Sequence, residues 1–253
     1  MFRIAGSAAA ALFALTAVGA ALAQEPPVMT AVVNGATFEA RLTPGVVASI
    51  FGMNLTAADE VTTCSVNGLP GHVLFADPAF PTQINVQLPV EAELGPAELV
   101  VTRGGVSSVS RIIILNRHAP AFFTTDSMSA GFFRHADFSL VTPENPAMPG
   151  ETIIGFGLGW GPTDPVVPTG VPSPADPLAL TVTQPGKEFK FYVGRVGIWQ
   201  EAVVRFSGLA PGLFSFYQFN FDVPLTADGP QTVFGIMNGQ VSNLVTLPVA
   251  GGG

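Results

Sequence analysis

The sequence predicts an all-β protein in which two tandem immunoglobulin-like β-sandwich domains follow a signal peptide. The first observation is a repeat, because the heptapeptide QINVQLP at residues 83–89 returns as QFNFDVP at residues 218–224. The second is composition: only 11% of the residues are charged, while the chain contains 28 glycines and 23 prolines. Such a composition favours short strands joined by many turns. The third is the regular recurrence of turn signals, which is typical of a sandwich.

Residues 1–23 are expected to be a signal peptide. Arg3 gives a positive start, an apolar run covers residues 4–20, and Ala21-Leu22-Ala23 has the small residues of a cleavage site. A retained membrane anchor is the alternative, which the shortness and alanine content of the run disfavour. No later stretch is long and apolar enough to span a bilayer. We therefore expect an exported protein, extracellular or periplasmic, with no membrane span after cleavage.

Residues 28–117 are expected to form the first sandwich. Its strands are predicted at residues 29–33, 37–42, 46–51, 62–66, 71–75, 82–88, 98–102 and 109–115. Asn-Gly pairs at residues 34–35 and 67–68 and a Pro-Gly pair at residues 44–45 supply turns between these strands. This succession of short strands and turns is the pattern of an immunoglobulin-like domain.

The repeated heptapeptide is predicted to be one strand of each sandwich. Apolar and polar residues alternate in both copies, which is the period of a strand buried on one face. Pro89 and Pro224 end these strands, because proline has no N–H group to donate to a neighbouring strand. We expect the amides to fix the strand register, and a polar binding face is the alternative. The amides are Gln83, Asn85, Gln218 and Asn220.

Residues 139–250 are expected to form the second sandwich, with strands at residues 153–159, 191–194, 218–224, 231–236 and 243–249. The segment 160–177 contains six prolines, too many for a sheet or a helix, and predicts a surface loop with extended backbone. Between the sandwiches, residues 118–138 contain five phenylalanines, too many for a solvated linker. We expect a docked aromatic connector that packs against both sandwiches or adds a strand to one.

Charge and composition argue against several kinds of function. A net charge of −8 provides no basic surface for nucleic acid. The three histidines, His72, His118 and His135, lack the spacing of a zinc site, and no calcium-binding loop occurs, so we expect no metal and no cofactor. No Gly-x-Ser-x-Gly turn supplies a hydrolase nucleophile, and we expect no catalytic residue. The single cysteine, Cys64, is expected to be a buried small hydrophobe, with a reactive or intermolecular thiol as the alternative.

Several short motifs occur in a fixed order along the chain. They are Pro44-Gly45 followed by a strand and Gly52-Met53-Asn54-Leu55, the Gln-x-Asn-x-x-x-Pro strand, Asn145–Gly150, Gly157-Leu158-Gly159, Gly208–Gly212 and Val241-Ser242-Asn243. In this order they resemble the uncharacterised paralogous domain abundant in exported acidobacterial proteins, whose members resemble tandem immunoglobulin-like domains of the IPT/TIG type. The resemblance covers residues 30–250, with departures at residues 75–82 and 178–190. It implies a fold and an export route, and no reaction.

Aromatic side chains are the most specific candidates for ligand binding. Strand alternation places Phe214 and Phe216 on the face opposite the core, next to Trp160 or Trp199 if the loops allow. Exposed aromatic side chains on a sandwich can stack on sugar rings or on an apolar partner surface. The alternative is that Phe214 and Phe216 cover the proline-rich loop or the connector.

Three classes of function follow from the sequence. The favoured one is an exported, non-catalytic interaction or adhesion module that binds an unknown protein, a glycan or other material at the cell exterior. The second is a carbohydrate-binding module that uses Trp160, Trp199, Phe214 and Phe216. The third is an enzyme, which would need a cleft with converging titratable groups and is not favoured by the low charge.

Overall fold

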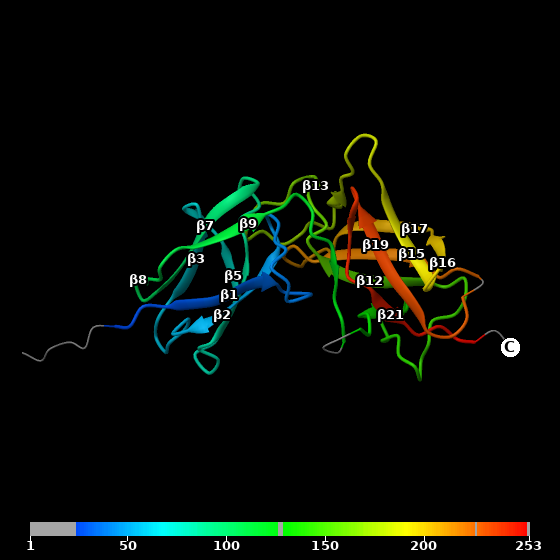
Figure 1. Ribbon diagram of the computed structural model, residues 1–253, viewed down its shortest axis with the longest axis horizontal. Coiled ribbons are helices and arrows are strands. Elements are labelled where there is room, and N and C mark those ends of the chain that lie inside the picture. The colour runs from blue at the N-terminus through cyan, green and yellow to red at the C-terminus, as the bar shows by residue number, and fades with distance from the viewer. Residues whose placement is uncertain (1–23, 126–128, 226, 252–253) are drawn as a thin grey trace, which may run out of the picture.

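The structure is a computed structural model that describes residues 24–125, 129–225 and 227–251. The expected signal peptide, residues 1–23, lies outside them. The described residues form 21 strands and no helix. They build two β-sandwiches that lie end to end, with the first and the last described residues toward opposite ends of the long axis (Figure 1). The predicted fold class, an all-β protein of two tandem immunoglobulin-like sandwiches, is confirmed.

The first sandwich has the strand order of an immunoglobulin domain. One sheet runs β1 (Val28–Asn34), β2 (Val47–Met53), β6 (Gln83–Gln87) and β5 (His72–Ala76). The facing sheet runs β4 (Leu69–Pro70), β3 (Thr62–Val66) and β7 (Gly95–Arg103), and both β8 (Val106–Ser107) and β9 (Arg111–Leu115) pair with β7. The seven main strands thus divide into the A-B-E-D and C-F-G sheets of that fold.

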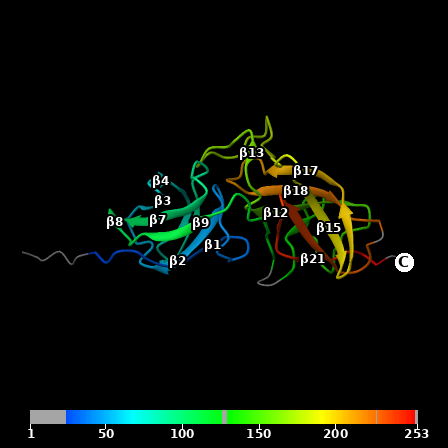
Figure 2. The ribbon, with the colours of Figure 1, turned by 45° about the horizontal axis from the view of Figure 1, so that its top comes forward.

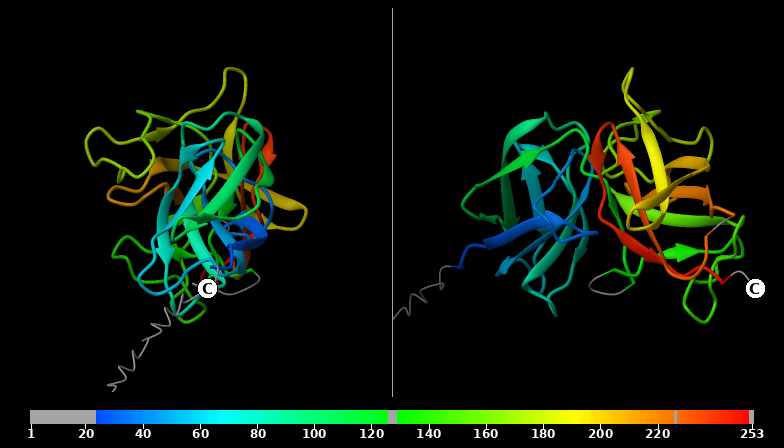
Figure 3. Two further views of the ribbon diagram at one scale, coloured as in Figure 1. Left: turned by 90° about the vertical axis from the view of Figure 1, so that its left-hand side faces the viewer. Right: turned by 45° about the vertical axis from the view of Figure 1, so that its right-hand side comes forward.

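The second sandwich repeats this order and adds two short strands to its first sheet. Its first sheet begins with β10 (Ala121–Phe122) and β11 (Phe133–Arg134), which both pair with β12 (Thr152–Leu158). The sheet continues through β18 (Tyr217–Asp222), β17 (Val204–Leu209), β14 (Leu180–Thr181) and β13 (Thr163–Asp164). The facing sheet runs β16 (Ile198–Ala202), β15 (Phe189–Arg195) and β19 (Gln231–Met237), with β20 (Gln240–Val241) and β21 (Val245–Leu247) on β19. The two sandwiches are seen side by side in Figure 2 and in the right view of Figure 3, whereas the left view of Figure 3 looks along the long axis and superposes them.

The repeated heptapeptide occupies the same place in both sandwiches. β6 lies between β2 and β5, and β18 lies between β12 and β17. In each copy the glutamine side chain donates to the asparagine two residues later, at 3.0 Å, so Gln83 pairs with Asn85 and Gln218 with Asn220. The intervening apolar side chains are fully buried, and they anchor two separate cores. These are Ile84 and Val86 in one copy and Phe219 and Phe221 in the other.

One expected strand of the first sandwich, residues 37–42, does not form. Phe38 has φ +57°, a left-handed conformation that a strand cannot contain. The Asn34 N–H donates to the Glu39 carbonyl and closes a local loop instead. Only Leu42 makes a bridge, to Leu115, and its side chain is buried in the core.

The connector, residues 118–138, adds β10 and β11 to the sheet of the second sandwich. Phe122 and Phe133 are fully buried in its core, whereas Phe123 packs against the core of the first sandwich. These contacts give the connector a place against both cores. The limits 28–117 and 139–250 drawn from the sequence stay predictions.

The proline-rich loop, residues 160–177, also contacts the first sandwich. The Thr169 hydroxyl donates to the Glu91 carboxylate at 2.6 Å, and the Gly170 N–H donates to the Gln87 side-chain carbonyl at 2.9 Å.

Within the ranges that the structure covers, no helix has the length and apolar character to cross a membrane.

Candidate ligand-binding face

Trp160 is a core residue, and its expected role at the surface is wrong. Its side chain is fully buried, its ring lies 4.5 Å from Phe219 and 5.2 Å from Phe122 between centroids, and its Nε1–H donates to the Ala121 carbonyl at 3.2 Å. The cause is the missing side chain of Gly235, since a Cβ there would overlap the indole. Trp160 therefore cannot stack on a ligand.

Phe214 and Phe216 each pack against another ring of the protein. The Phe214 ring stands 4.8 Å from the His72 ring of the first sandwich. Phe216 stacks on Phe123 of the connector, with centroids 5.1 Å apart and planes inclined by 17°. The structure therefore does not bring the four predicted aromatic residues together. Phe216 covers the connector, as the alternative interpretation proposed, whereas Phe214 contacts the first sandwich.

Phe216 also lines an open groove of about 380 Å³ on the outer side of its sheet. Its polar neighbours are few, and one of them, Arg134, already lies over the Phe132 ring at 5.0 Å and donates to the Phe138 carbonyl. The groove is lined by Phe123, Thr124, Phe132, Arg134, Phe156, Leu213 and Phe216. Because its rings are packed in pairs and its polar groups are scarce, it offers little to a hydroxyl-rich ligand.

Trp199 stands on the outer face of the β16-β15-β19 sheet, where two further aromatic residues join it. In the strand register Trp199 lies opposite Gly194, and Tyr192 lies opposite Phe234. Residues directly opposite each other in an antiparallel pair point to the same face. The Tyr192 and Phe234 rings stack at 5.2 Å, and Trp199 meets Phe234 edge-on at 5.0 Å. We call Tyr192, Trp199 and Phe234 the aromatic face.

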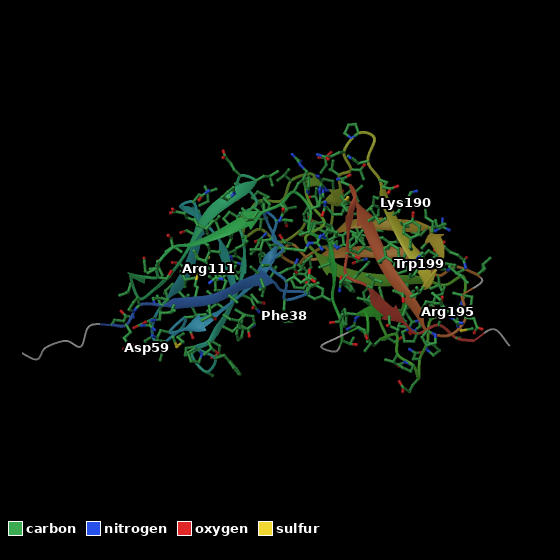
Figure 4. All side chains as sticks on the ribbon, viewed as in Figure 1. Phe38, Asp59, Arg111, Lys190, Arg195 and Trp199 are labelled. Atoms are coloured by element: carbon green, nitrogen blue, oxygen red, sulfur yellow. The ribbon has the colours of Figure 1, made fainter. Side chains whose placement is uncertain are left out.

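Strand alternation explains why this face is aromatic and solvent-accessible. Phe191 and Val193 flank Tyr192 in sequence and are buried in the core, so Tyr192 must point outward. Val233 is likewise buried, which sends Phe234 outward. All three side chains of the aromatic face are partly exposed. Figure 4 shows Trp199 and Lys190 on this side of the second sandwich.

Charged groups border the aromatic face. The Lys190 ammonium lies 3.3 Å from the Glu188 carboxylate and 3.4 Å from the Glu201 carboxylate. Hydrogen bonds to Glu188 and then to Glu201 raise the pKa of Lys190 above its ordinary value, so the ammonium stays charged. Glu201 faces Tyr192 across the strand pair, and Thr232 faces Gly194. The face thus combines flat rings with charged and hydroxyl groups at its rim.

Sequence reasoning found Trp199 and missed Tyr192 and Phe234. The signal was present, because Phe-Lys-Phe-Tyr-Val-Gly-Arg and Gln-Thr-Val-Phe-Gly-Ile-Met both alternate with a period of two. What the sequence did not contain was the register that sets Tyr192 opposite Phe234. That register pairs residues 42 positions apart in the chain. They belong to β15 and β19, which lie next to each other in Figure 1.

The histidines and the cysteine have local partners or are buried. His118 Nε2 accepts from the Asn238 amide at 2.9 Å, and His135 Nδ1 lies 2.6 Å from the Glu151 carboxylate. Cys64 is a buried free thiol, as predicted, and burial raises its pKa to about 12. Across the residues that the structure describes, no group of three or more His, Cys, Asp or Glu side chains could hold a metal ion.

No model of a known protein family matches the sequence, and no curated protein matches it. The predicted resemblance to the exported acidobacterial domain thus gains no support from these comparisons.

Solved structures with some similarity include two SGBP-B proteins and one tandem of titin Ig domains. One is SGBP-B of the Bacteroides ovatus mixed-linkage glucan utilization locus, in complex with a mixed-linkage heptasaccharide; identity is 12%, the TM-score is 0.38, and the match covers 84% of this chain and 43% of that chain. Another is the surface glycan-binding protein PbSGBP-B from Prevotella bryantii, with 9% identity and a TM-score of 0.29 over 88% of this chain and 42% of that chain. A third is the titin Ig tandem A164-A165, with 10% identity and a TM-score of 0.24 over 83% of this chain and 89% of that chain. The chain thus spans less than half the length of the two glycan-binding proteins.

Proposed function

We propose that the protein is a non-catalytic binding module of the cell exterior and that its aromatic face binds a carbohydrate chain. One observation carries the proposal: Tyr192, Trp199 and Phe234 lie side by side on an outward-facing sheet. Aromatic rings pack on the apolar C–H faces of sugar rings, and their large area contributes much of the contact energy at such sites.

The polar groups at the rim of the aromatic face can bind the hydroxyl groups of a sugar. Sugar hydroxyls need hydrogen-bond partners when they leave water, because an unpaired polar group costs about 1–3 kcal/mol. Lys190, Glu201 and Thr232 present charged and hydroxyl groups next to the rings. Hydrogen bonds to ionised groups are about twice as strong as neutral ones. The open groove at Phe216 lacks a comparable rim.

The shape of the site favours an extended glycan over a single small sugar. The rings rest on a sheet rather than in an enclosed cavity, so successive sugar units can lie along the strands. The sheet fixes the three rings through the pairing of β15 with both β16 and β19, and rigid positioning lowers the entropy cost of binding.

Binding without catalysis fits the chemistry around the aromatic face. The ionisable groups at its rim are paired, because the Lys190 ammonium forms ion pairs with both Glu188 and Glu201. A catalytic carboxylate pair would instead flank a bound sugar with separated pKa values. Export to the cell exterior, signal-peptide cleavage and membership of the acidobacterial domain family are parts of the same proposal, and they rest on the sequence motifs described above.

The test is glycan-array screening followed by affinity electrophoresis in gels that contain the best polysaccharide. We expect Trp199→Ala and Tyr192→Ala to weaken binding about ten-fold, which corresponds to roughly 1.4 kcal/mol. Phe80→Ala is the matched control, because Phe80 is 58% exposed in the first sandwich, away from this sheet. Absence of any glycan ligand overturns the proposal. Loss of binding in Phe216→Ala with full binding in Trp199→Ala would move the site to the groove.

A protein partner is the second candidate, and the edge strand β16 favours it. β16 ends its sheet, the exposed fraction of Ile198 at its start is 71%, and that of Val203, the residue directly after the strand, is 54%. A strand with apolar side chains at a sheet edge can pair with a strand of another protein. Pull-down of an exterior protein that Ile198→Lys abolishes, and that glycan does not displace, would favour this candidate.

A further inference from the structure

A pocket of about 220 Å³ lies at the junction of the two sandwiches. The first sandwich supplies one wall through the segment around Val46 and through Val90 and Leu94. The second sandwich supplies the other wall through Val167 and Leu209. Neither sandwich forms the pocket alone, so any ligand inside it contacts both.

Most of the lining is apolar, and five polar side chains interrupt it. Pockets for drug-sized ligands are usually about 300–1,000 Å³, so this one suits a small molecule. The polar side chains are those of Thr43, Arg117, Thr163, Ser215 and Tyr217. The Thr163 hydroxyl donates to the Pro165 carbonyl at 3.0 Å and the Tyr217 hydroxyl donates to the Gly161 carbonyl, so Thr43, Arg117 and Ser215 are left to meet a ligand. A sugar is a poor fit, because apolar walls leave most of its hydroxyls without partners.

Arg117 is a cation without a counter-ion. Among the described residues its guanidinium makes no hydrogen bond and no salt bridge. Arg117 is exposed, so water solvates its guanidinium when no anion is bound. Arginine presents a planar pair of N–H donors that matches a carboxylate. The pocket therefore combines an apolar interior with an anion-binding group.

Two buried hydroxyls add hydrogen-bonding capacity. Thr43 is 1% exposed, and within the described chain its hydroxyl has no hydrogen-bond partner. Ser215 is 8% exposed and accepts a hydrogen bond from the Gln87 amide at 2.6 Å, which leaves its own O–H free to donate. Both hydroxyls line the pocket, so a ligand inside it can reach them.

We propose that this junction pocket binds a small amphipathic carboxylate, such as a short fatty acid or an aromatic acid. The carboxylate contacts Arg117 and the hydroxyls of Thr43 and Ser215, and the apolar body fills the space between the valine and leucine walls. Because both sandwiches contribute, the bound acid stabilises the docked arrangement of the two domains. The site is separate from the aromatic face, and its occupancy does not depend on Trp199.

The experiment is isothermal titration of the mature chain with hexanoate and benzoate, and with the matched alcohols hexanol and benzyl alcohol. We expect an acid to bind and its alcohol to bind about ten-fold more weakly. Arg117→Gln should weaken acid binding about ten-fold, whereas Arg111→Gln, an exposed arginine of the first sandwich that donates to Met29, should change it less than about two-fold. Thr43→Val should weaken acid binding in the same direction as Arg117→Gln.

A second variant separates loss of the site from loss of the fold. Val166→Trp places a large ring at the pocket mouth, where Val166 is 65% exposed, and should block the acid while thermal unfolding stays unchanged. Trp199→Ala should retain full acid binding. Equal binding of acid and alcohol, equal binding by the Arg117 variant, or no binding at about 10 mM of either acid overturns the proposal.

Discussion

The side chain of Gln87, at the end of the motif strand of the first sandwich, donates to the Ser215 hydroxyl of the second sandwich at 2.6 Å. Its carbonyl end accepts the Gly170 N–H at 2.9 Å. Gln87 points away from its own core and is still only 1% exposed, because the second sandwich covers it. Both ends of this amide are thus used to join the sandwiches.

Replacing Gln87 should loosen the junction. Gln87→Leu leaves the Gly170 N–H without its side-chain acceptor in a covered position, and such a loss costs about 1–3 kcal/mol. We expect a lower urea midpoint and a larger radius of gyration by small-angle scattering. Gln83→Leu is the matched control, because Gln83 bonds only to Asn85 within its own strand. An unchanged scattering profile for Gln87→Leu would show that the junction does not depend on this amide.

The contact between Thr169 and Glu91 should make stability depend on pH. Burial raises the pKa of Glu91, but hydrogen bonds from Thr169 outweigh this and hold it below its ordinary value of 4.5. A depressed pKa means that the carboxylate stabilises the fold above about pH 4.5 and that this contribution is lost as the pH falls through the lower folded-state pKa. Glu91→Gln should therefore reduce the urea midpoint at neutral pH. The difference from wild type should shrink in acid, and a constant difference would contradict the assignment.

The two histidines of the connector should titrate on opposite sides of their ordinary pKa of 6.5. Burial, with a smaller contribution from the Arg117 charge, lowers the pKa of His118 to about 4. Burial lowers the pKa of His135 as well, but hydrogen bonds to Glu151 and Asn145 reverse this and raise it above 6.5. The His135 contribution to stability is therefore present below pH 6.5 and is lost as the pH rises through the raised value. NMR titration checks both, and Glu151→Gln should lower only the His135 value.

Truncating the two tryptophans should lower the free energy of unfolding by very different amounts. Trp160→Ala removes a fully buried side chain, which costs about 3–5 kcal/mol. Trp199→Ala removes a partly exposed side chain and should change the free energy of unfolding by less than about 1.5 kcal/mol. Chemical denaturation measures both. Destabilisation of the Trp199 variant as large as that of the Trp160 variant would place Trp199 in the core.

The thiol of Cys64 should be unreactive in the native protein. Its pKa of about 12 and its buried position leave almost no thiolate near neutral pH. Ellman's reagent should modify Cys64 only in denaturant, and a non-reducing gel should show a monomer. Rapid labelling of the native protein would mean that β3 opens readily.

The sequence was most informative where a signal is local. The alternation in QINVQLP and QFNFDVP predicted a half-buried strand in each sandwich, because a period of two follows directly from strand geometry. The phenylalanines of the connector, such as Phe122, predicted a docked segment, because so much apolar surface is not stable in water.

Packing between residues far apart in the chain was harder to predict from the sequence. Trp160 lies in a segment rich in proline and glycine, which is typical of the surface, yet Gly157 and Gly235 come from different strands and leave room for its indole. Tyr192 and Phe234 became part of a candidate site only through strand register. The expected strand at residues 37–42 does not form because Phe38 has a left-handed backbone conformation, which is uncommon for phenylalanine and could not be predicted from the sequence.

The position equivalent to Gln87 in the second motif strand is Asp222, and it is engaged locally. Its carboxylate accepts from the Thr152 hydroxyl at 2.6 Å and from the Arg205 guanidinium at 2.6 Å and 2.9 Å. The two motif strands thus share their core-facing pattern, but where the first has an amide bonded to the next sandwich, the second has a carboxylate paired within its own sandwich. The contact that Gln87 makes to the second sandwich therefore has no counterpart at Asp222, and the two sandwiches are joined head to tail through unlike surfaces.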